Sequence, residues 1–119
     1  MKINLDDGKP IYLQVAEGIE DDILDGYIEE GAQVMSTNQF ASVYGINPAT
    51  AGKGINMLVD EEILFKKRGI GMFVRDGAKE QIKQKRRKLF FNEYVISMLK
   101  EAEKLDITKE EIIEMLKEK

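Results

Sequence analysis

The sequence indicates a mainly α-helical chain with one small β-hairpin, and three observations support this interpretation. Two short helical segments are separated by a tight turn at Gly45. Two short apolar strands follow directly and flank the turn at residues 68–71. From about residue 78 the pattern is helical almost to the end. A helix-turn-helix followed by a hairpin predicts a winged helix-turn-helix over residues 1–76, with residues 77–119 as a helical tail.

The first helix is expected to begin at Pro10, because proline suits the first helical turn, where its missing N–H costs nothing. Gly26 and then Gly31 are expected to end this helix and begin a turn. Residues 1–9 are expected to be extended or loose. The apolar stripe recurs at helical spacing and comprises Ile11, Tyr12, Val15, Ile19, Ile23 and Leu24.

The second helix has clear signals at both ends. Ser36 is its predicted N-cap, and Gln39, three residues later, matches a capping box. Gly45 should end the helix in the left-handed conformation, with Ile46 buried in the turn. Residues 33–35 before it resemble a very short strand. The side chains expected to face inward are Phe40, Ala41 and Val43.

The third helix, Asn47–Asp60, is the segment around which the chain is organised. Asn47 is a good N-cap, and Pro48 occupies the first helical position. One face of this helix is apolar and carries Ala51, Ile55, Leu58 and Val59. The opposite face is small or polar and carries Ala49, Thr50, Lys53 and Asn56. Such a helix fits the major groove of DNA, although an ordinary surface helix has a similar pattern.

The hairpin after this helix is predicted to be the wing. Ile63–Lys67 and Met72–Arg75 are its strands, and the turn between them contains Gly69 and Gly71. Its basic tip can reach a phosphate or the minor groove, because the two glycines let the backbone approach closely.

The tail is predicted to hold one long helix from about Ala78 to Leu105, and a last helix that a capping box of Thr108 and Glu111 begins. These helices are too small to bury a core of their own, so a second copy of the chain is the expected partner. The alternative is that they fold back on the N-terminal domain. The predicted dimer interface comprises Phe90, Phe91, Tyr94, Val95, Met98, Leu99, Ala102, Leu105, Ile112, Ile113 and Leu116.

The amino-acid composition excludes several classes of function. The 119 residues include no cysteine and no histidine, which removes disulfides, thiol nucleophiles, zinc clusters and histidine chemistry. We therefore predict no catalytic residues, no metal and no cofactor, and a protein that is not an enzyme. No signal peptide or membrane span is recognisable, which favours the cytoplasm. The net charge is −4, but residues 66–88 hold ten bases and two acids, so a local positive potential toward nucleic acid is expected.

From Lys9 to Val74 the sequence resembles the DNA-binding domain of GntR-type bacterial transcription regulators. The resemblance rests on Pro10–Val15, Ile23–Gly31, Asn47–Ala51, Asn56–Leu64 and Lys67–Val74. The short tail is similar to the small YtrA-like branch, which implies a homodimeric repressor, often of transporter-type operons.

Two positions depart from the family pattern. Asn38 stands where an arginine that contacts DNA is usual, and Gly52-Lys53 stands where one or two basic residues are common. Gly52 and Gly54 should also weaken the third helix by about 1 kcal/mol each relative to alanine.

We therefore expect a homodimer that binds double-stranded DNA at a palindromic operator, with half-sites about 10–10.5 base pairs apart. The alternative is a protein-interaction module that keeps the fold and has lost operator binding. A small-molecule effector between the dimer helices is left open, and no membrane partner is expected. The predicted DNA-binding residues are Ser36, Thr37, Asn38, Asn47, Ala49, Thr50, Lys53, Lys67, Arg68, Gly69 and Gly71.

Overall fold

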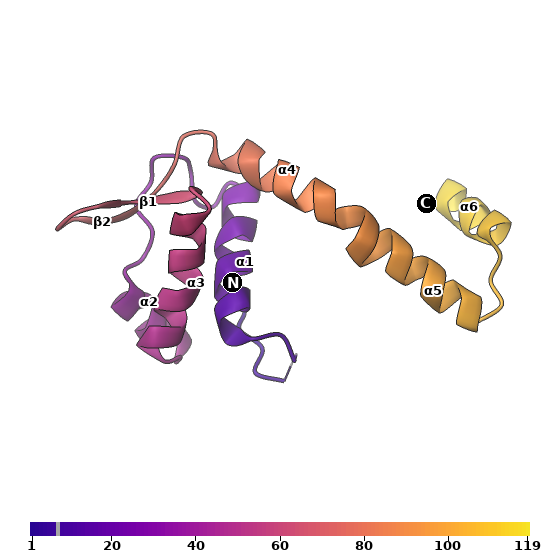
Figure 1. The fold of residues 1–119 in the computed structure, drawn as a ribbon, viewed down its shortest axis with the longest axis horizontal. Coiled ribbons are helices and arrows are strands. Elements are labelled where there is room, and N and C mark those ends of the chain that lie inside the picture. The colour runs from indigo at the N-terminus through magenta and orange to yellow at the C-terminus, as the bar shows by residue number, and fades with distance from the viewer. Residues whose placement is uncertain (7) are drawn as a thin grey trace. The chain divides into compact units, whose positions relative to one another are not determined.

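In the computed structural model, which describes residues 1–6 and 8–119, two helices pack side by side to form the centre of the N-terminal unit (Figure 1). These are α1 (Ile11–Leu24) and α3 (Pro48–Asp60). The apolar stripes read from the sequence are the surfaces that meet, and Val15, Ala51 and Ile55 are fully buried between them.

Helix α2 (Thr37–Tyr44) is the first helix of the helix-turn-helix. The Ser36 hydroxyl accepts from the backbone N–H of Gln39, and the Gln39 side chain accepts from the N–H of Ser36, so the predicted capping box is present. Gly45 ends the helix with φ +65°, in the left-handed region. Val43, which we expected to face inward, is 65% exposed, because the short helix buries only Phe40 and Ala41.

The hairpin consists of β1 (Leu64–Lys67) and β2 (Gly71–Val74), paired antiparallel with Leu64 opposite Val74. The segment before α2 lies beside β2, because the Val34 N–H donates to the Met72 carbonyl. The strand expected over residues 33–35 is reduced to a single bridge between Gln33 and Phe73. Figure 1 shows the hairpin projecting away from the helices, with its turn at the far end.

The core of this unit reaches past the hairpin into the next helix. Ala78 and Ile82, in the first turns of α4 (Ala78–Phe90), are fully buried in it. The compact unit therefore runs from Met1 to Lys83 and includes the first turns of the tail that we had placed after residue 76. The rest of the buried apolar core is formed by Val15, Ala16, Ile19, Ile23, Val34, Phe40, Ala41, Ala51, Ile55, Leu58, Ile63, Leu64 and Val74.

The second unit, Gln84–Lys119, contains the remainder of α4, a π-helical segment η1 (Phe91–Val95), α5 (Ile96–Lys104) and α6 (Lys109–Glu118). The segment predicted to be one helix from Ala78 to Leu105 is helical from Ala78 to Lys104, and it widens to π geometry at η1. The Thr108 and Glu111 capping box begins α6 as predicted. Ala102 of α5 and Ile112 of α6 are buried within this single chain.

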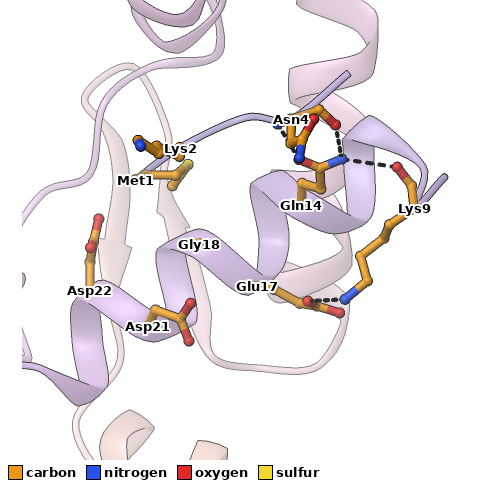
Figure 2. Close-up of a pocket in the computed structure, with 9 residues that line it drawn as sticks. All are labelled: Met1, Lys2, Asn4, Lys9, Gln14, Glu17, Gly18, Asp21 and Asp22. Carbon is orange, nitrogen blue, oxygen red and sulfur yellow. Dashed lines mark hydrogen bonds and ion pairs between the residues drawn. The ribbon is translucent and has the colours of Figure 1, made fainter. Parts of the chain in front are cut away.

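The N-terminal segment, expected to be loose, is held against α1 (Figure 2). The Gln14 side chain donates to the carbonyls of Asn4 and Lys9 and accepts from the Asn4 N–H, at 2.7 to 3.0 Å. A Cβ on Gly18 would lie 2.6 Å from Met1 side-chain atoms, so the glycine leaves room for that methionine. Asp7 lies outside the described residues.

Candidate nucleic-acid interface

Helix α3 has a buried back and an exposed front. Ala51, Ile55 and Leu58 are completely buried, whereas Ala49 and Lys53 are exposed and Thr50 is half-buried. The Asn47 side chain accepts from the Ala49 N–H at 2.8 Å, and Pro48 follows at the first helical position, as predicted. The helix is thus fixed at its N-terminus, where side chains of a recognition helix contact base edges.

The first turn of α2 lies beside α3. Thr37 is half-buried, and its Cγ2 would lie 3.4 Å from a Cβ on Gly52. Ser36 and Asn38 are exposed, but the Ser36 hydroxyl already accepts the capping hydrogen bond. Asn38 therefore presents an exposed amide near the start of α2, at the position where the resemblance led us to look for an arginine.

The ammonium group of Lys53 lies over an aromatic ring of α1. Its Nζ is 3.9 Å from the ring centroid of Tyr12, within the range of a cation–π interaction. The helices approach closely beside this pair, because a Cβ on Gly54 would lie 2.5 Å from the Tyr12 carbonyl oxygen and 2.8 Å from Val15 Cβ. We had expected Tyr12 to be a core residue and did not predict this contact, because the partner lies 41 positions away in the chain.

The wing combines basic side chains with an aromatic pair. Lys67 and Arg68 are exposed, and Gly69 adopts φ +77° in the turn beside them. Phe65 and Phe73, opposite each other across the strands, stack with ring centroids 5.9 Å apart. Lys67 Nζ lies 4.3 Å from the Phe73 centroid and 5.7 Å from the Phe65 centroid, so the aromatic pair contacts the cation at the end of β1.

Gln33 holds the wing turn from outside the hairpin. Its side-chain amide donates to the Ile70 carbonyl at 3.1 Å. The same amide nitrogen would lie 2.5 Å from a Cβ on Gly71, which has φ +147°. Gly71 is therefore needed for its backbone conformation, and its missing side chain leaves room for the Gln33 amide. The sequence predicted the glycine but contained no signal for the glutamine.

Glu30 links the loop after α1 to the first turn of α4. The Gly77 N–H donates to one carboxylate oxygen at 2.7 Å, and the Lys79 N–H donates to the other at 3.1 Å. These two donors, first that of Gly77 and then that of Lys79, lower the pKa of the Glu30 carboxyl, and the Lys79 ammonium adds to the effect. The carboxylate is thus an N-terminal cap for α4 supplied from a distant segment.

The tail exposes many apolar side chains, as a surface that needs a partner would. Tyr94 is 64% exposed and Leu116 is 65% exposed. Ala102 and Ile112, from the predicted interface, are instead buried within the chain. Val95 and Leu99 are half-buried. The other predicted interface residues are exposed, and they are Phe90, Phe91, Met98, Leu105 and Ile113.

Among the described residues, no group of three or more carboxylates is placed to hold a metal ion. None of the helices that the structure describes is both long enough and apolar enough to cross a membrane. The residues of the predicted DNA-binding site lie on or beside α2, α3 and the hairpin, all within the unit Met1–Lys83, and most of them are exposed.

Comparison with known proteins gives a family. The model of bacterial regulatory proteins of the gntR family matches residues 11–74. The HTH-type transcriptional repressor NagR of Bacillus subtilis is 31% identical over 84 residues, which cover 71% of this chain and 35% of NagR. The chain spans between 28% and 35% of the length of the curated relatives that it matches.

Solved structures extend the similarity into the tail. A GntR-family regulator structure from Bacteroides thetaiotaomicron is 38% identical, with a TM-score of 0.73, covering 91% of this chain and 94% of that one. A GntR-family regulator from Listeria monocytogenes is 31% identical, with a TM-score of 0.77, covering 97% of this chain and 99% of that one.

Two further structures are informative: one is of a YtrA protein, and the other is of a complex with DNA. YtrA from Sulfolobus acidocaldarius is 30% identical, with a TM-score of 0.60, covering 74% of this chain and 95% of that one. The DNA-binding domain of AraR, solved in complex with operator ORX1, is 32% identical, with a TM-score of 0.51, covering 53% of this chain and 76% of that one. The predicted fold, mainly α with a two-strand hairpin, is confirmed. The chain therefore belongs to the GntR family of bacterial regulatory proteins, and residues 11–74 form its winged helix-turn-helix.

Proposed function

We propose that this protein is a sequence-specific transcriptional repressor that binds a palindromic operator as a homodimer. The observation that carries the proposal is the division of α3 into a fully buried back, at Ala51, Ile55 and Leu58, and an exposed front, at Ala49 and Lys53. That division leaves the side chains of the front exposed, where they can meet base edges in a major groove.

Each part of the surface has its own role in this proposal. Ala49, Thr50 and Lys53 read bases, because they lie on the front of the recognition helix. Asn38 and Lys67 hold phosphates on either side of it, and the tip at Arg68–Gly71 approaches the minor groove. The structure of the similar AraR DNA-binding domain in complex with operator ORX1 supports the same use of the fold here.

The homodimer is proposed from the tail. Its exposed aromatic and aliphatic side chains make a surface that a second copy would cover, since closed two-fold dimers are the commonest assembly of soluble proteins. Two-fold symmetry then requires a palindromic site. Repression is proposed because the matched relative NagR is named as a repressor.

The experiment is selection of bound fragments from genomic DNA, followed by titration of the best fragment against a scrambled duplex of equal length. We expect the selected fragments to share a palindrome and to bind at least about a thousandfold more tightly than the scrambled duplex. Lys53→Gln should reduce that ratio. Lys109→Gln, the same charge change on α6, is the matched control and should leave it unchanged. Equal binding to all duplexes would contradict sequence-specific recognition and favour the protein-interaction alternative.

A further inference from the structure

Lys53 is the one basic residue in the sequence of α3, so its placement decides what charge the recognition helix presents to DNA. A free lysine side chain samples many rotamers and loses that entropy when it binds. Here the ammonium lies 3.9 Å from the centroid of the Tyr12 ring, which comes from α1. The ring therefore restricts the cation before any DNA is present.

The backbone explains why the two residues can meet. Gly54 follows Lys53, and a Cβ there would lie 2.5 Å from the Tyr12 carbonyl oxygen and 2.9 Å from Val15 Cγ1. The missing side chain thus lets α3 approach α1 at the level of Tyr12. Tyr12 is itself half-buried, at the point of α1 where α3 approaches it.

We propose that Tyr12 is a positioning residue for DNA recognition, which holds the Lys53 ammonium in the orientation that contacts DNA. The proposal rests on the proposed function, since it concerns the same surface. Tyr12 acts through Lys53, and its ring lowers the entropy that Lys53 loses on binding.

The test compares four variants in titrations of the selected operator: Tyr12→Phe, Tyr12→Leu, Lys53→Met and the double change Tyr12→Leu with Lys53→Met. Tyr12→Phe keeps the ring and should bind as the parent does. Tyr12→Leu should weaken binding about two- to fivefold, the range of an exposed cation–π contact. In the Lys53→Met background, Tyr12→Leu should cause no further loss, because the contact is already absent.

A second measurement is independent of DNA. The ε-methylene protons of Lys53 should show an upfield ring-current shift in the NMR spectrum of the parent and of Tyr12→Phe, and Tyr12→Leu should abolish it. The amide spectrum of Tyr12→Leu also shows whether the variant is folded, so a loss of binding through unfolding is recognised.

The outcomes separate the two proposals. If the parent binds no DNA fragment, the proposed function fails and the DNA role of Tyr12 fails with it. If the parent binds its operator but Tyr12→Leu binds equally well, the positioning role alone is overturned. Equal losses from Tyr12→Leu in the parent and in the Lys53→Met background would also overturn it, because they would assign the effect to the fold.

Discussion

Gly54 of α3 faces the carbonyl oxygen of Tyr12 in α1 so closely that a Cβ at position 54 would lie 2.5 Å from it. At Gly52, two positions earlier, a Cβ would meet only Thr37, with Cγ2 at 3.4 Å, which is ordinary van der Waals contact. From the sequence, we expected both glycines to weaken the helix equally. The structure separates them, because only Gly54 lies at the close approach of the two helices.

Alanine at these two positions should therefore have opposite effects on stability. Gly52→Ala should raise the free energy of unfolding by up to about 1 kcal/mol, because alanine favours the helix. Gly54→Ala should lower it by about 1–3 kcal/mol, because the added methyl forces α3 away from α1. Urea denaturation followed by circular dichroism measures both. A stabilised Gly54→Ala variant would contradict the close approach.

A second prediction concerns pH and the Glu30 cap. Because the pKa of Glu30 is lower in the folded protein, its contribution to stability is fully present above the unfolded value of about 4.3 and is lost as the pH falls through the folded value. Glu30→Gln should thus be less stable than the parent at pH 7, and the two should converge in acid.

Urea denaturation midpoints across a pH series test this cap. Glu29→Gln removes the same charge from the preceding residue and serves as the control. A constant difference between parent and Glu30→Gln from about pH 7 down to about pH 3 would show that the ionised carboxylate does not stabilise the start of α4.

The positive charge of Lys67 in the wing should raise the affinity for DNA by the same factor whatever the base sequence. Lys67→Gln should weaken binding to all duplexes by a similar factor and reduce the slope of log K against log salt by about 1, because one phosphate contact is lost. Lys109→Gln in α6 should leave the slope unchanged. A change in base preference without a change in slope would place Lys67 at a base edge instead.

The exposed apolar side chains of the tail should hold the dimer together. Changing both Tyr94 and Leu116 to glutamate should weaken self-association at least about tenfold, because the interface would then bury charges. Val43→Glu, at an equally exposed apolar residue of α2, is the control. Sedimentation equilibrium distinguishes monomer from dimer. A parent protein that sediments as a monomer would contradict the dimer.

Local signals in the sequence were sufficient for most of the fold. The caps of α2, α3 and α6 were predicted correctly, since each depends on residues within three positions of one another. Gly45 was predicted to be left-handed for the same reason and has φ +65°. The hairpin was also predicted, from two short apolar segments on either side of a glycine-containing turn.

What the sequence could not reveal depends on contacts between distant segments. Nothing near Ile82 shows that it joins the core of the N-terminal unit, and nothing near Tyr12 shows that its ring meets Lys53. The inward position expected for Val43 was wrong, because helical spacing alone does not tell how wide a face a short helix buries. The π geometry of η1 likewise has no local signature.

Methylation protection of guanine N7 in the selected operator reports directly on recognition by α3, because that atom lies in the major groove. If α3 reads the groove in each protomer, the parent protein should protect guanines in two clusters about 10–10.5 base pairs apart, and Lys53→Gln should alter protection within both clusters equally. Tight binding with every guanine N7 still open to methylation would contradict recognition by α3.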